Sequence, residues 1–118
     1  MIPPLTDALE TLAGRSDVAG ALVVSDEGLV VAAAMPDGAE LEAIAALAAT
    51  AQRALASLSS AIGHGPASQT VLDGPDGSAV IVRLDSGATI VVLAAADGDL
   101  GDLLYAIRGS LPRLAGLV

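Results

Sequence analysis

The chain has 118 residues, including 14 acidic side chains, five arginines, one histidine and no lysine, and its net charge is −9. This charge disfavours nucleic-acid binding and docking to an anionic membrane, because both need a basic surface, so any macromolecular partner is expected to be protein. The chain has no cysteine, which excludes disulfides, thiolate nucleophiles and cysteine-based metal sites, and one histidine cannot form a metal cluster by itself.

Hydrophobic residues make up 53% of the chain and charged residues 16%, which indicates a folded protein, and the length suits one domain over residues 1–118. Residues 1–4 contain no basic segment before an apolar run, so the start is not typical of a signal peptide. The longest apolar runs reach about half of the roughly 20 residues needed to span a bilayer. We therefore expect a cytoplasmic protein without membrane insertion.

The first predicted elements are a short helix and a hairpin. An amphipathic helix is expected over residues 5–13, with Thr6 as a candidate N-cap. Two apolar runs, 20–25 and 29–34, flank the turn-like segment 26–28, which is typical of a β-hairpin. Neither run alternates apolar with polar residues, so we expect both faces of this hairpin to be covered.

A long helix is predicted next, over residues 38–62. Asp37 and Glu40 form a capping-box pattern at its start, and Gly63 and Gly65 can end it. The helix would run the full width of the domain.

Three strands and a last helix complete the chain. Turn-forming residues separate strands expected at 69–73, 78–84 and 88–95, and a helix begins at Asp97 or Asp99. Hairpin-linked strands interrupted by one helix predict an α+β fold, with an antiparallel five-stranded sheet and helices on both faces.

The long helix carries two distinct stripes at helical spacing. The first is expected to face the sheet and contains Leu41, Ile44, Ala48, Ala51, Leu55, Leu58 and Ile62. The second contains only residues no larger than threonine: Ala39, Ala43, Ala46, Thr50, Ala54, Ser57 and Ala61. A face of small residues lets another helix approach closely, so we predict an antiparallel contact between two copies of this helix. The alternative is that alanine is simply the best helix former and that the face has no partner.

Residues that could carry chemistry give no convincing active site. A Walker-type phosphate loop needs a lysine, and the chain has none. His64 could serve as a general base, but no nucleophile stands near it in the sequence, which favours a solvated loop residue. Asp97, Asp99 and Asp102 resemble a cation site only loosely, and helix capping explains them more simply. Arg53 lies at the edge of the small-residue stripe, where it either is solvated or marks an interface.

Several segments together resemble the Roadblock / dynein light-chain domain family. These are residues 18–32, the long Ala/Leu helix, the turn at Asp76-Gly77 and residues 99–108. The resemblance covers nearly the whole chain, and its specificity comes from the order and spacing of the pieces. It implies a five-stranded antiparallel sheet with the long helix on one face and the two terminal helices on the other.

The resemblance also implies a function. Members of the family form homodimers or heterodimers, and many bind Ras-like small GTPases, so a short member of bacterial appearance is expected to be a non-enzymatic adaptor that regulates a GTPase, without a cofactor or metal. In such a dimer the long helices pair and the third strands join. The implied dimer contacts are Ala43, Ala46, Thr50, Ala54 and Ser57 on the helix and Thr70, Val71 and Leu72 on the joining strand. Arg53 is added to these contacts because it lies at the edge of the small-residue stripe.

Two other functions stay open. One is a small-ligand sensor with a pocket between helix and sheet, although a core of alanine, valine and leucine without aromatic residues favours solid packing over a cavity. The other is an enzyme that uses His64 with an aspartate, which has the least support from the sequence.

Overall fold

A computed structural model describes residues 3–96 and 98–118. The elements in chain order are α1 (Pro3–Ala13), β1 (Val18–Val24), β2 (Val30–Ala34), α2 (Leu41–Ala61), β3 (Gln69–Gly74), β4 (Gly77–Arg83), β5 (Thr89–Ala94) and α3 (Leu100–Gly116). Every predicted helix and strand is present, and their ends differ from the predicted ones by a few residues.

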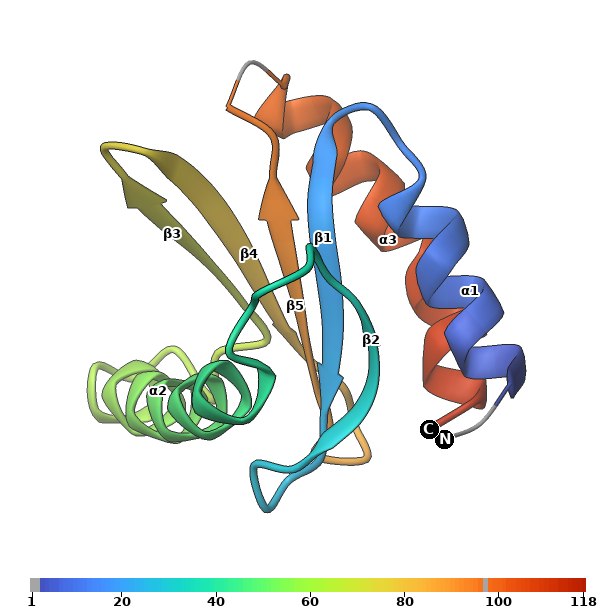
Figure 1. The fold of residues 1–118 in the computed structure, drawn as a ribbon. Coiled ribbons are helices and arrows are strands. Elements are labelled where there is room, and N and C mark those ends of the chain that lie inside the picture. The colour runs from blue at the N-terminus through green and yellow to red at the C-terminus, as the bar shows by residue number, and fades with distance from the viewer. Residues whose placement is uncertain (1–2, 97) are drawn as a thin grey trace.

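The five strands form one antiparallel sheet in the order β2-β1-β5-β4-β3. The early hairpin and the later three-strand meander are joined side by side through β1 and β5. Figure 1 shows α1 and α3 together on one face of this sheet and α2 on the other. The predicted α+β sandwich is confirmed.

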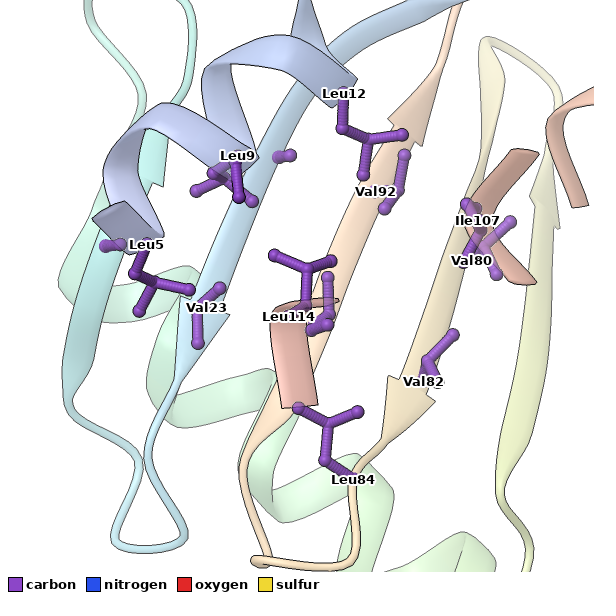
Figure 2. Packing of buried hydrophobic residues seen from close by; sticks show 14 of the residues in the cluster. Leu5, Leu9, Leu12, Val23, Val80, Val82, Leu84, Val92, Ile107 and Leu114 are labelled. Carbon is purple, nitrogen blue, oxygen red and sulfur yellow. The ribbon is translucent and has the colours of Figure 1, made fainter. Parts of the chain in front are cut away.

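The larger core lies between the sheet and the two terminal helices (Figure 2). Leu5 and Leu9 of α1 and Ile107 of α3 are fully buried, and they pack in one cluster with strand residues such as Val23 and Val92. Burying a side chain of this size contributes about 1.5–3 kcal/mol each, so this cluster is the main source of stability.

The smaller core lies under α2. It joins Leu22 and Val24 of β1 and Val91 of β5 to alanines of the helix. Adjacent strand residues therefore point into different cores, which explains why β1, and β5 after Thr89, are apolar throughout.

Two predicted N-caps are wrong. α1 begins at Pro3 because prolines suit the first turn of a helix, so Thr6 lies inside the helix. α2 begins at Leu41 with Glu40 as its N-cap residue, and no side chain caps this end. A capping box needs its acidic residue three positions inside the helix, and Glu40 instead stands at the boundary.

The predicted end of α2 is confirmed. Gly63 adopts a φ of 83°, its N–H donates to the carbonyl of Ser60 at 3.0 Å, and the N–H of His64 donates to the carbonyl of Ser59 at 2.9 Å. These two bonds form a Schellman motif, which needs a left-handed residue that glycine adopts without strain.

Candidate protein-interaction face

The side of α2 that faces the sheet consists of small residues and one glutamine. Its buried residues are Ala45, Ala48, Ala49 and Gln52. The turn between β1 and β2 also comes close, because a Cβ built on Gly28 would lie 3.5 Å from the Cβ of Ala49. Short side chains on both sides are what permits this approach.

The predicted orientation of α2 is wrong, because most of the stripe that was expected to face the sheet lies at the flanks of the helix or is exposed. Leu58 and Ile62 are each 58% exposed, while Leu41, Ile44 and Leu55 are half-buried at the flanks. At 100° per residue the helix is rotated by roughly a quarter turn from the predicted orientation. The reason is that alanines allow closer contact with the sheet than leucines would. A prediction from hydrophobicity alone instead places the larger leucines against the sheet.

The small-residue stripe lies opposite the sheet and is exposed. The exposed members within α2 are Ala43, Ala46, Thr50, Ala54, Ser57 and Ala61, whereas Ala39 precedes the helix and is half-buried. The hydroxyl of Thr50 donates to the carbonyl of Ala46 at 2.9 Å, so its hydrogen-bonding need is met within the helix. We call these six residues the small-residue face; it carries no charge.

Exposed leucines border this face: Leu58, which was expected to face the sheet, and Leu47, which belongs to neither predicted stripe. Leu47 is 69% exposed and lies next to the small-residue face together with Leu58. Both project within about 40° of Ala54 on the helix, so helical spacing places them beside the small-residue face.

The outer strand β3 adds a second exposed apolar element. Within the described residues it pairs only with β4, so its other edge is open. Leu72 is 62% exposed, Val71 is also exposed and Thr70 is half-buried. An open edge with apolar side chains is a template for pairing with another strand.

Arg53 turns toward its own chain. Its Nη1 donates to the backbone carbonyl of Asp26 at 3.2 Å and ties α2 to the turn between β1 and β2. Residues 3–96 and 98–118 contain one ion pair, between Arg15 and Asp17, so neither Arg53 nor Arg83 is paired with a carboxylate there.

Beside Arg53 is a cavity of about 370 Å³ between α2 and the end of the sheet where the β1–β2 and β4–β5 turns lie. Its lining is Ser25, Asp26, Ala49, Gln52, Arg53, Ala56, Ser57, Pro66, Arg83, Gly87 and Thr89. Alanines on α2 are too short to fill the space that opens where the strands end.

Besides Thr89, the buried polar residue that lines this cavity is Gln52, at 4% exposure. Its Nε2 donates to the carbonyl of Ala67 at 3.0 Å, whereas its Oε1 has no hydrogen-bond partner. A carbonyl can only accept, so the amide nitrogen must face Ala67 and the free oxygen must face elsewhere. An acceptor left unpaired in the interior costs about 1–3 kcal/mol.

The remaining candidate residues have structural roles. His64 is exposed in the loop that ends α2. Asp99 caps α3, since its Oδ1 accepts from the backbone N–H of Asp102 at 3.2 Å, and Asp97 lies outside the described residues. In the part of the chain that the structure describes, no three His, Asp or Glu side chains gather as a metal site would require.

No helix in the described residues is long and apolar enough to cross a membrane.

The ion pair between Arg15 and Asp17 predicts a small acid sensitivity. Two bonds of 2.9 Å join the guanidinium to the carboxylate, and they hold the pKa of Asp17 below its ordinary value of 3.8. A lowered pKa in the folded state gives stability that is present above the unfolded pKa and is lost as the pH falls through the folded one. The difference in urea midpoint between wild type and Asp17→Asn should therefore shrink from about pH 5 to pH 3.

The matched control is Glu27→Gln, which removes a carboxylate from an exposed turn. An Asp17→Asn variant whose midpoint follows that of wild type over the whole range would contradict a stabilising ion pair.

Comparison with known proteins identifies the family. The sequence model of the Roadblock/LC7 domain matches residues 5–94. The uncharacterized protein MJ0714 of Methanocaldococcus jannaschii is 33% identical over 118 residues, which is 99% of each chain. MglB of Myxococcus xanthus has a TM-score of 0.90 at 17% identity over 97% of this chain and 86% of its own. A structure described as MglB with tetrameric arrangement has a TM-score of 0.89 at 19% identity, over 98% and 88%. The two solved structures show that the fold is the same, and the matches to the domain model and to MJ0714 show similarity in sequence. The chain therefore belongs to the Roadblock/LC7 domain family.

Proposed function

We propose that this protein is a non-enzymatic adaptor that works as a dimer in the cytoplasm and regulates a small Ras-like GTPase. The observation that carries the proposal is the exposed small-residue face of α2, together with the open edge of β3. Membership of the Roadblock/LC7 domain family supports it, because the resemblance described above implies dimers that bind such GTPases.

The contact would follow a two-fold axis. Two α2 helices would pack antiparallel through Ala43, Ala46, Thr50, Ala54 and Ser57, and the β3 strands would pair through Thr70, Val71 and Leu72. Arg53 would stand at the border of this contact. One fold neighbour, MglB with tetrameric arrangement, is a self-assembling example of the fold, which supports association between copies.

The charge distribution is compatible with this contact. Each chain carries a net charge of −9, so two chains repel one another at long range. The small-residue face contributes no charge to that repulsion, and its exposed neighbours Leu47 and Leu58 would lose contact with water in the dimer. A heterodimer with a related subunit would satisfy the same surfaces.

The regulatory step would belong to the partner. Phosphoryl transfer in GTPases depends on positioned charges and a positioned water, and this chain offers no arginine on the small-residue face to supply such a charge. A dimer can still favour one GTPase conformation by binding it more tightly than the other.

The test is a titration of each purified Ras-like GTPase from the same genome, loaded with GDP or with a non-hydrolysable GTP analogue. We expect one GTPase to bind with at least about a tenfold preference for one nucleotide state. Hydrolysis rates measured with and without the adaptor separate an activator from a scaffold. Equal or absent binding in both states across all GTPases would refute the proposal.

A further inference from the structure

We propose that the cavity between α2 and the sheet binds a small organic anion that carries a carboxylate or phosphate together with a hydrogen-bond donor. The proposal concerns the cavity lined by Gln52, Arg53 and Arg83 and is independent of the GTPase. It gives the small-ligand alternative a definite place, between the long helix and the sheet.

The cavity has more positive than negative lining residues, although the chain is acidic overall. Two of its five arginines line one cavity in a molecule of net charge −9, against a single acidic lining residue, Asp26. Neither arginine is neutralised by an ion pair within the described residues. Arginine pairs well with carboxylate and phosphate oxygens, so this cavity can attract an anion. A hollow of about 410 Å³ beside Arg15 and Arg113 also has two arginines, but Arg15 is already paired with Asp17.

The two arginines come from opposite walls. Arg53 projects from α2 and is held by its bond to the Asp26 carbonyl, which uses one of its five N–H groups. Arg83 ends β4, opposite Thr89 of β5, and its backbone N–H donates to the carbonyl of Ser68 at 2.9 Å. Both backbones are fixed, so the guanidinium groups are carried by a rigid frame.

The buried glutamine specifies the second half of the ligand. Because Nε2 of Gln52 is committed to Ala67, its free Oε1 is an acceptor that only a donor can satisfy. A hydroxyl or amide N–H on the bound molecule would supply that donor. An anion without a donor would leave Gln52 unpaired and should bind less tightly.

The size of the cavity limits the ligand to a small molecule. At about 370 Å³ it is at the lower end of ordinary small-molecule sites, which span about 300–1,000 Å³. A larger hollow of about 610 Å³ lies near Arg15, but that arginine is already paired with Asp17, and Asp99 and Asp102 add negative charge. The larger hollow is therefore unsuited to an anion.

The test is an NMR titration of the full-length, nitrogen-15-labelled protein with four probes. Glycerol 3-phosphate and lactate carry both an anion and a hydroxyl, acetate carries the anion without a hydrogen-bond donor, and glycerol carries hydroxyls only. We expect saturable shifts at the Gln52 side-chain amide and the Gly87 and Thr89 backbone amides, with a Kd of about 10 mM or tighter, for at least one of the first two. The better of those two identifies the anionic group.

A pair of variants localises the binding. Arg83→Gln should weaken binding about tenfold, because it removes a charge-assisted hydrogen bond at the cavity. Arg108→Gln makes the same change of charge on α3, on the other face of the sheet, and should change the Kd by less than about twofold. Arg83 is exposed and its backbone bond does not depend on the side chain, so the fold should be retained.

Three results would overturn the proposal. These are no saturable shift with either two-group probe, equal weakening by Arg83→Gln and Arg108→Gln, and binding of acetate or glycerol alone as tight as that of the better two-group probe. None of them bears on the GTPase titration, so the two proposals fail separately.

Discussion

In analytical ultracentrifugation we expect the wild-type protein to sediment as a dimer and the variant Ala54→Arg, at the same concentration, to sediment as a single chain. Ala54 lies in the small-residue face opposite the sheet, where a two-fold contact would place one new arginine on each helix. Two unpaired guanidinium groups in a close helix contact are costly, so the dissociation constant should rise about a hundredfold or more.

The control for this variant is Ser60→Arg. Ser60 is exposed on the same helix but lies outside the small-residue face, so the added charge and length are the same while the contact is spared. Circular dichroism of both variants should match that of the wild type, because neither residue is buried. Dissociation by both variants alike, or a wild-type protein that stays a single chain at millimolar concentration, would argue against pairing through this face.

The variant Ile107→Ala is expected to lose about 3 kcal/mol of unfolding free energy. Ile107 is fully buried on α3, in the same cluster as Val80 and Val92 (Figure 2). Removing three carbons there loses their transfer free energy and leaves a cavity that a sheet packed against two helices cannot easily close. Urea denaturation at a fixed protein concentration measures the change, since self-association would otherwise alter the apparent stability.

Tyr105→Ala serves as its control, two positions earlier on the same helix. Tyr105 is 82% exposed, so a much larger truncation should change stability by no more than about 0.5 kcal/mol. A loss below about 1 kcal/mol for Ile107→Ala would mean that α3 packs on the sheet less tightly than the structure indicates.

Much of the fold could be predicted because local chemistry specifies it. Gly63 ends α2 since only a left-handed residue closes that turn, and Asp99 begins α3 because its carboxylate accepts from the first turn. Strands apolar at every position required cover on both faces, which predicted the two helical layers correctly. These features depend on neighbours within a few residues of one another.

The candidate site was predictable in part. The small-residue face is exposed as its pattern indicated, because six positions free of long side chains leave little doubt about which side of the helix they share. The exposure of Leu58 was not predicted, because its helical spacing placed it in the sheet-facing stripe, and Leu47 was assigned to neither stripe. The cavity was not predicted either, because Gln52, Arg53 and Arg83 meet only once α2 lies across the end of the sheet.

The sequence by itself determined where helices and strands begin and end to within a few residues, which layers they form and which helix face stays free of bulk. Tertiary structure alone decided that β1 lies beside β5, that alanines rather than leucines of α2 touch the sheet, and that two arginines share one cavity. The physical reason is that residue spacing encodes the shape of each element, whereas the rotation and placement of one element on another depend on how whole surfaces fit together.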